Sequence, residues 1–219
     1  MLSLGMDIGT STVKLVLLKN QEIEKQWMAV HHGRPFACLK KGLSALELDA
    51  DTPFSLCVTG SNTEALLEQA PDIPSFGDIP AVVEGVRQIV PQAGSVIEIG
   101  SQGARFITDL QSRAPQFSVN EHCAGGTGSF FEDQMSRVGC RLGDYSSLVE
   151  QARSVPRLSG RCAVFAKTDI IHRQQEGVST PDILLGLCYA MIRNYKATIV
   201  RRLPVCKPVV FCGGVTCNT

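Results

Sequence analysis

The sequence predicts an α/β protein with mixed sheets, and three observations lead to that class. Apolar runs of strand length alternate along the chain with segments whose apolar residues recur every three or four positions. Two strand-like runs near the N-terminus are joined by a Gly-Thr-Ser turn, which is typical of an antiparallel hairpin. The expected order is strands, helix, strand, helix, strands, helices and a last strand. With 219 residues, of which 44% are hydrophobic, the chain is long enough to bury a core.

The first part of the chain is expected to begin with an antiparallel meander. Leu2, Leu4 and Met6 alternate with small or polar residues, and a second apolar run begins at Val13. The Ser-Asn-Thr-Glu sequence at 61–64 resembles a capping box before a helix. The expected elements are strands at 2–18 joined by a turn at 9–12, a strand at 21–30, a helix at 35–49, a strand at 54–59, a helix after residue 64, a loop at 71–80 and a helix at 81–90.

The second part is expected to hold three strands, then helices, then one strand. Thr180 as a cap and Pro181 at the first position predict the start of the longest helix, whose apolar stripe continues to about residue 202. Gly139 and Gly177 are expected to end the two helices before it. The expected elements are strands at 96–100, 105–110 and 116–120, helices from residue 128, at 163–176 and at 181–202, and a strand at 209–212.

Composition excludes several classes of function. The 21 Lys and Arg balance the 21 Asp and Glu, so nothing favours binding to nucleic acid or to an anionic membrane. No apolar run approaches the roughly 20 residues of a membrane-spanning helix, and no secretory signal is evident, so we expect a cytoplasmic protein. Reducing conditions disfavour disulfides among the nine cysteines. Seven of these have no predicted role: Cys38, Cys57, Cys140, Cys188, Cys206, Cys212 and Cys217.

A turn with the chemistry of a phosphate site follows the first strand. The pattern is Asp7-x-Gly9-Thr10-Ser11-x-x-Lys14, and a tight turn rich in Gly, Thr and Ser can point backbone N–H groups and hydroxyls into one concavity. Asp7 could hold Mg²⁺ or its waters, and Lys14 could add positive charge. The pattern is not a Walker A loop. Taken alone, it is interpreted equally well as an ordinary hairpin turn.

Two further strands also end in glycine. Glu98-Ile99-Gly100-Ser101-Gln102 places a second carboxylate at a strand end, and Gly213-Gly214 follows the last strand. Three such turns resemble those of the actin, hexokinase and Hsp70-like (ribonuclease H-like) ATPase superfamily. That resemblance implies two subdomains, 1–95 and 96–219. It also implies that the first two turns grip phosphates while the third lies against adenosine. A plain strand exit stays the alternative for the third turn.

Two cysteines stand at the mouths of predicted helices. Cys123 precedes Gly125-Gly126-Thr127-Gly128 and a helix, and Cys162 directly precedes another helix. The partial positive charge of a helix N-terminus favours a thiolate. A [4Fe–4S] cluster takes four thiolates, so two per chain predict a symmetric dimer that shares one cluster. Two ordinary buried cysteines are the alternative.

Together, these motifs resemble one family. The Asp7–Thr12, Ile97–Gln102, Asn120–Gly128 and Cys162–Ala166 segments are similar to those of ATP-dependent activators of 2-hydroxyacyl-CoA dehydratases, grouped with the ATPase subunits of benzoyl-CoA reductase. The chain looks most like the first ATPase module of the long CoA-enzyme activases. The resemblance implies a homodimer whose single [4Fe–4S] cluster is held by Cys123 and Cys162. ATP hydrolysis with Mg²⁺ would then drive a low-potential electron to an iron–sulfur dehydratase or reductase partner.

The resemblance also assigns the nucleotide site. It implies catalytic roles for Asp7, Glu98 and Gln102. The implied contacts with ATP or ADP are Gly9, Thr10, Ser11, Thr12, Lys14, Gly100, Ser101, Gly126, Thr127, Gly213 and Gly214.

The sequence departs from the family pattern at two places. Gly103 stands where the family has an acidic residue, and the sequence ends at Thr219, so a fold incomplete at its C-terminus is expected. Two alternatives to the activator therefore stay open: a truncated ATPase-fold module without catalysis, and a small-molecule kinase of the same superfamily. We expect His31 and His32, which precede Gly33, to be solvated in a surface turn.

Overall fold

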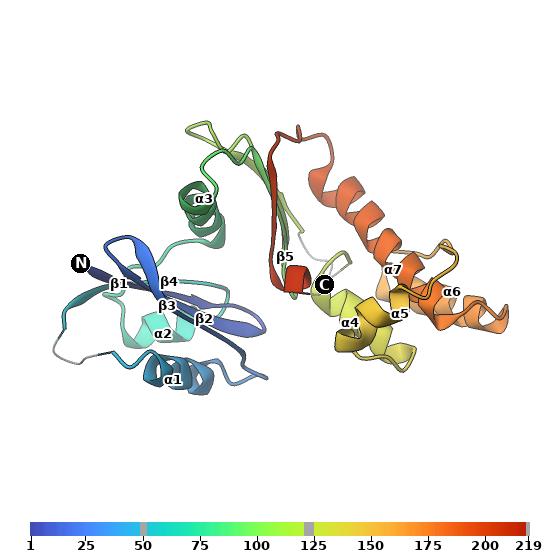
Figure 1. Ribbon diagram of the computed structural model, residues 1–219, viewed down its shortest axis with the longest axis horizontal. Helices are drawn as coiled ribbons and strands as arrows, with labels where there is room; N and C mark the ends of the chain where they lie inside the picture. Colours follow the sequence, from blue (N-terminus) through green and yellow to red (C-terminus); the bar gives the residue numbers. More distant parts are fainter. Residues whose placement is uncertain (49–51, 121–124, 218–219) are drawn as a thin grey trace. The chain divides into compact units, whose positions relative to one another are not determined.

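The computed structural model describes residues 1–48, 52–120 and 125–217, which fall into two compact units, Met1–Gly85 and Val86–Thr219. Each unit is built on one four-stranded sheet (Figure 1). Helix α3 (Asp78–Ile89) contains the point where the first unit gives way to the second.

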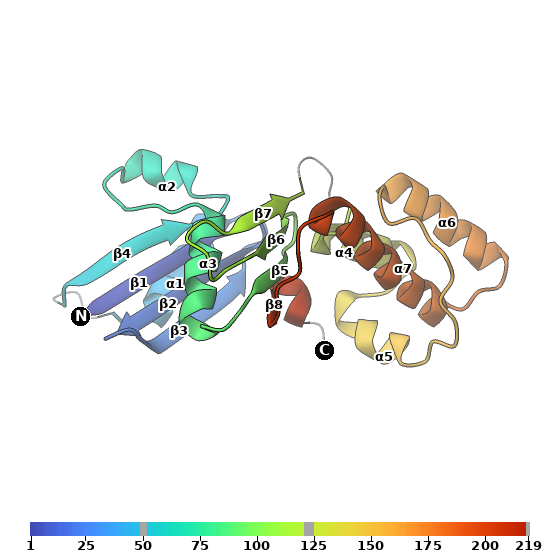
Figure 2. The same cartoon turned by 90° about the horizontal axis from the view of Figure 1, so that it is seen from above.

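The first sheet has the strand order β3-β2-β1-β4 (Figure 2). Strand β1 pairs antiparallel with β2 and parallel with β4, and β2 pairs antiparallel with β3. Alternate residues of β2, among them Val13, Leu15 and Leu17, point into the core that α1 covers, as the period of two requires. The bounds are β1 Leu2–Ile8, β2 Thr12–Lys19, β3 Glu22–Val30, α1 Pro35–Ala45, β4 Phe54–Thr59 and α2 Glu64–Gln69.

The second sheet repeats this topology with the order β7-β6-β5-β8. Strand β5 pairs antiparallel with β6 and parallel with the distant β8. A second core lies among α4, α6 and α7, which sit at one end of this unit (Figure 1). The bounds are β5 Ser95–Ile99, β6 Ala104–Thr108, β7 Gln116–Val119, α4 Gly128–Arg137, η1 Leu142–Asp144, α5 Tyr145–Val149, α6 Ala163–Gln175, α7 Thr180–Tyr195, η2 Lys196–Val200, β8 Val209–Cys212 and η3 Gly214–Cys217.

The predicted α/β class with mixed sheets is confirmed, and the strands at 54–59 and 209–212 have the expected bounds. Two predicted helix starts are wrong in detail. The cap of α7 is Ser179, whose hydroxyl accepts the Asp182 N–H, and Thr180 is already helical. The capping box predicted at 61–64 is absent: Thr63 and not Ser61 is the N-cap residue of α2, Glu64 is its first helical residue, and no side chain caps the helix.

Four short elements were not expected, among them the 3₁₀ turn η3 after β8. Residues 142–149 form the η1 turn and α5, and the longest helix widens into a π-helical turn, η2, after Tyr195. Such a turn carries one extra residue, so the apolar stripe predicted to residue 202 does not continue as one α-helix. No helix in the described part of the chain is long and apolar enough to cross a membrane.

Candidate functional site

The first phosphate-type turn joins β1 to β2. Asp7 and Lys14 face each other in the last pairs of the hairpin, and the Lys14 ammonium donates to the Asp7 carboxylate at 2.6 Å. The Gly9 N–H donates to the Thr12 carbonyl at 3.0 Å and so closes the turn. Both side chains of the ion pair stay more than one third exposed, at 35% for Asp7 and 42% for Lys14. The pair is therefore able to exchange partners with a cation or an anion from solvent.

The back of this turn is held by two side chains from other segments. The Gly9 carbonyl accepts a hydrogen bond from the Asn62 amide at 2.8 Å and lies 3.2 Å from Nε2 of His31. His31 is 8% exposed, so the expectation that it is a solvated surface residue is wrong, whereas His32 is exposed. Local sequence favoured a surface turn because it could not show that the His31 ring contacts the Gly9 carbonyl, which lies 22 positions earlier in the chain.

The second phosphate-type turn joins β5 to β6. The Gly100 N–H donates to the Gly103 carbonyl at 2.7 Å, and the first turn of α4 docks directly on it. The N–H groups of Gly128 and Ser129 donate to the carbonyls of Gly100 and Ser101. The structure therefore brings the Gly100–Gln102 turn and the Thr127 end of α4 together, as a shared ligand site would require.

The carboxylate of the second turn has a partner that sequence reasoning missed. Glu98 lies opposite Arg105 on β6, and one guanidinium nitrogen of Arg105 contacts both carboxylate oxygens, at 2.7 and 2.8 Å. These side chains are only 15% and 19% exposed. A basic residue across the hairpin was the available signal, since Asp7 and Lys14 show the same spacing as Glu98 and Arg105. A catalytic role for Glu98 stays a prediction.

In each sheet, a glycine follows the strand that pairs in parallel with the strand before the phosphate-type turn. Gly60 follows β4 with a φ of +108°, and Gly213 follows β8 with a φ of +96°. A Cβ on Gly60 would lie 2.5 Å from the carbonyl carbon of Ile8, and one on Gly213 would lie 2.6 Å from that of Ile99. Both positions thus require glycine, and the third turn packs against the end of β5 as expected of neighbouring parallel strands.

Cys212 occupies the last position of β8, beside Glu98 in the sheet register. Burial, and then the nearby Glu98 charge, raise the pKa of the Cys212 thiol to about 11. The thiol is therefore protonated at neutral pH. Cys140 and Cys188 pack against the helical core, as small apolar side chains do.

The two cysteine segments converge in the second unit. Cys162 is the N-cap residue of α6 and is half-buried. A Cβ on Gly125 would overlap the carbonyl oxygen of Arg161, so the backbone two residues after Cys123 touches the backbone just before Cys162. Cys123 itself lies outside the described residues, as does its neighbour His122. Within the described residues, no three His, Cys, Asp or Glu side chains gather as a metal site.

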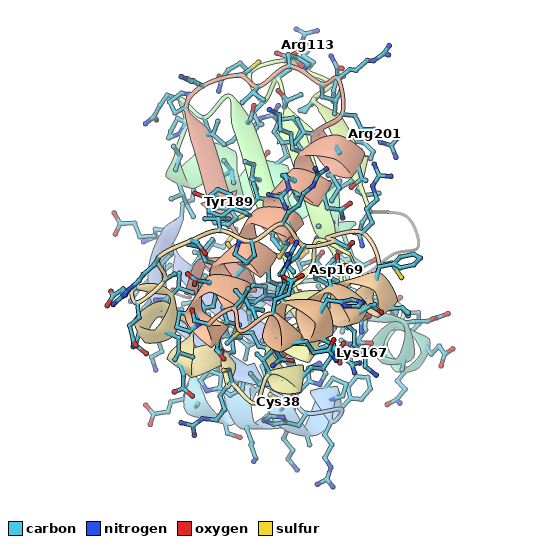
Figure 3. All side chains as sticks on the ribbon, turned by 90° about the vertical axis from the view of Figure 1, so that its right-hand side faces the viewer. Cys38, Arg113, Lys167, Asp169, Tyr189 and Arg201 are labelled. Carbon is cyan, nitrogen blue, oxygen red and sulfur yellow. The ribbon has the colours of Figure 1, made fainter. Side chains whose placement is uncertain are left out.

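Side chains of α6 and α7 anchor these segments. The Asn194 amide donates to the Gly125 carbonyl at 2.9 Å in a buried position. Asp169, labelled on α6 in Figure 3, accepts a hydrogen bond from the Ser159 N–H at 2.8 Å. Gly125 is thus fastened to α7 and Ser159 to α6, by side chains that the sequence motifs did not identify.

Comparisons with known proteins agree with this arrangement. The family model described as "BadF/BadG/BcrA/BcrD ATPase family" matches residues 4–219. The 2-hydroxyisocaproyl-CoA dehydratase activator of Clostridioides difficile is 26% identical over all of this chain and 83% of its own length. A benzoyl-CoA reductase subunit of Thauera aromatica is 27% identical over 96% of this chain and 76% of its own length. The resemblance stated from the motifs is thereby confirmed.

Two solved structures share the fold. Component A of the (R)-2-hydroxyglutaryl-CoA dehydratase of Acidaminococcus fermentans has a TM-score of 0.88 at 24% identity, covering all of this chain and 85% of its own. The activator of the 2-hydroxyisocaproyl-CoA dehydratase from Clostridium difficile, with bound ADPNP, has a TM-score of 0.86 at 26% identity, covering all of this chain and 82% of its own. The expected actin- and hexokinase-like ATPase fold is confirmed by these neighbours.

Proposed function

The chain belongs to the BadF/BadG/BcrA/BcrD ATPase family, and we propose that it is an ATP-dependent iron–sulfur electron donor. Its partner would be an enzyme like a 2-hydroxyacyl-CoA dehydratase or a benzoyl-CoA reductase, since relatives are named as activators or subunits of these enzymes. A cytoplasmic location fits this role, because reducing conditions keep thiols available as ligands.

The observation that carries the proposal is the convergence of the two cysteine segments. Gly125, two positions after Cys123 in the sequence, touches the carbonyl of Arg161, the residue directly before Cys162. Cys162 is the N-cap residue of α6, a helix of 13 residues. Two thiolates per chain match half of a [4Fe–4S] ligand set, so a homodimer would complete it. When bound, such a cluster supplies a one-electron redox centre.

The two hairpin turns support the nucleotide part of the proposal. Asp7 is exposed enough to hold Mg²⁺ or its waters, and its partner Lys14 could move to a phosphate oxygen. Gly100, Ser101 and Gln102 would contact phosphate beside the N-terminal end of α4. A solved neighbour named as an activator holds ADPNP, a nucleotide analogue.

An anaerobic reconstitution tests the cluster directly. We expect a brown protein with an iron–sulfur absorbance, an EPR signal on reduction, about four iron atoms per dimer, and the mass of two chains in solution. The Cys162→Ala variant should lose the cluster. Cys57→Ala is a matched control, because this half-buried thiol lies on β4 of the other unit and should have no effect. A colourless monomer, or a cluster that survives loss of both Cys123 and Cys162, would reject the proposal.

A second candidate function is a nucleotide-binding module without hydrolysis. Two observations favour it: Gly103 has no carboxylate, and Glu98 is engaged by Arg105 on both oxygens. Under this alternative, Mg-ADP binds but phosphate release from Mg-ATP does not exceed that of a control lacking Asp7. Sustained Mg-ATP turnover that depends on Asp7 would exclude it.

A further inference from the structure

The orientation of the first phosphate-type turn depends on residues outside it. The Gly9 carbonyl accepts from the Asn62 side chain at 2.8 Å, and the Asn62 N–H donates to the Ile8 carbonyl at 2.9 Å. From the other side, Nε2 of His31 lies 3.2 Å from the Gly9 carbonyl, and the His31 N–H donates to the Ser11 carbonyl at 3.0 Å. His31 and Asn62 thus contact three carbonyls of this turn, which are those of Ile8, Gly9 and Ser11.

The tautomer of His31 follows from its second contact. The Gly33 N–H donates to Nδ1 of His31 at 3.1 Å, so Nδ1 carries a lone pair. The neutral ring then has its proton on Nε2, and Nε2 donates to the Gly9 carbonyl. At 8% exposure the ring is shielded from solvent, which keeps this contact in place.

This arrangement decides which backbone groups face a ligand. In a trans peptide the C=O and the following N–H point to opposite sides. Because the Gly9 carbonyl is turned toward His31 and Asn62, the Thr10 N–H is turned away from them. A carbonyl oxygen facing a phosphate would repel it, whereas an N–H attracts it.

We propose that His31 and Asn62 are positioning residues for nucleotide phosphate: by holding the Gly9 carbonyl they present the Thr10 N–H to it. The inference rests on the proposed nucleotide binding and concerns residues that touch the turn rather than the ligand. It explains why a histidine in a polar His-His-Gly sequence is buried.

Calorimetry with Mg-ADP tests the proposal on the full chain. His31→Ala and Asn62→Ala should each weaken Mg-ADP binding by about fivefold, as expected for one lost hydrogen bond. Binding of adenosine, measured by ligand-observed NMR so that weak affinity is registered, should be unchanged. His31→Gln should recover part of the loss, because its amide can donate to the Gly9 carbonyl. His32→Asn is the matched control, since His32 is exposed and asparagine tolerates its φ of +47°.

Three outcomes are informative. Selective loss of Mg-ADP affinity with rescue by His31→Gln supports the positioning role. Unchanged Mg-ADP affinity in a folded variant, or equal weakening of Mg-ADP and adenosine, overturns it while leaving the proposed function intact. A wild-type chain that binds no Mg-ADP removes the proposed nucleotide function and this inference together. If His31→Ala fails to fold by circular dichroism, Asn62→Ala carries the same test.

Discussion

The turn of the first sheet and the turn of the second follow one plan but hold their carboxylates differently. In each turn, the second-last residue of the first strand is acidic and pairs with a basic residue across the hairpin. These pairs are Asp7 with Lys14 and Glu98 with Arg105. The Asp7 carboxylate receives one contact from a lysine that is 42% exposed. The Glu98 carboxylate is contacted at both oxygens by an arginine that is 19% exposed.

The difference in exposure between the two ion pairs indicates that the two turns have different roles. A lysine–carboxylate pair near solvent is weak and exchanges partners readily, which suits a site that must take up a cation and a phosphate. One guanidinium nitrogen of Arg105 contacts both oxygens of Glu98, and an ion pair withdrawn from solvent is costly to break. We therefore expect the first turn to respond to ligands and the second to act mainly as a rigid frame.

The largest loss of stability is expected at the two glycines that occupy corresponding positions, Gly60 after β4 and Gly213 after β8. Gly60→Ala and Gly213→Ala should each lower the free energy of unfolding by about 4 kcal/mol, combining left-handed backbone strain with overlap against a carbonyl. Urea unfolding measures this. Gly85→Ala is the control: a Cβ there meets nothing within 4 Å, and alanine should stabilise α3 slightly. Different losses at the two positions would show that the shared plan is only superficial.

The next effect should separate the two ion pairs. Arg105→Met leaves the Glu98 carboxylate withdrawn from water without its partner and should cost about 3 kcal/mol of stability. Adding Glu98→Met should recover much of that loss, as a double-mutant cycle in urea would measure. A loss under about 1 kcal/mol for Arg105→Met would contradict the rigid-frame interpretation.

Lys14→Met tests the opposite expectation for the first turn. Because the pair is exposed, stability should change by less than about 1 kcal/mol. Mg-ADP binding should weaken by about tenfold, since a charged donor to phosphate is lost. Calorimetry beside a urea titration gives both numbers. A destabilised variant with normal nucleotide affinity would reverse the roles we assign to the two turns.

The smallest effect concerns the residue beside each carboxylate, which is Thr59 in the first sheet and Cys212 in the second. Burial and Glu98 raise the pKa of the Cys212 thiol from its ordinary value to about 11. The folded state binds the proton of the Cys212 thiol more tightly than the unfolded state does. The contribution of this thiol to the free energy of unfolding is therefore complete below pH 9 and declines as the pH rises toward about 11. Cys212→Thr should flatten that part of the stability profile. An unchanged alkaline slope would contradict this assignment.

Local patterns were sufficient to predict much of the fold. The β1–β2 hairpin, the strand at 54–59 and the helix that ends before Gly177 follow from alternation, turn residues and a glycine stop within a few positions. Helix α5 was missed because its five residues are too few to show a helical period. The widened turn after Tyr195 was missed for a related reason, since an inserted residue disturbs a stripe without leaving a sequence signal.

Local sequence patterns predicted less of the candidate site than of the fold. Motifs identified the turns, but they did not predict that Arg105 would engage Glu98 or that His31 would be buried. The ring of His31 contacts the Gly9 carbonyl, and Gly9 is 22 positions away in the sequence. The resemblance to a family supplied the cofactor expectations, and these stay predictions for Cys123, which lies outside the described residues.

The parallel pairing of the second sheet has a consequence for how the chain is made. In the first sheet, Leu2 finds its parallel partner at Phe54, whereas Ser95 in the second must wait for Val209, more than twice as far along the chain. During vectorial synthesis the first sheet can therefore close early, while β5 keeps an unpaired edge until residues 209–212 have emerged. The turn that we expect to be more rigid belongs to the sheet that closes later, so synthesis that stops before residue 209 would leave β5 with an open edge.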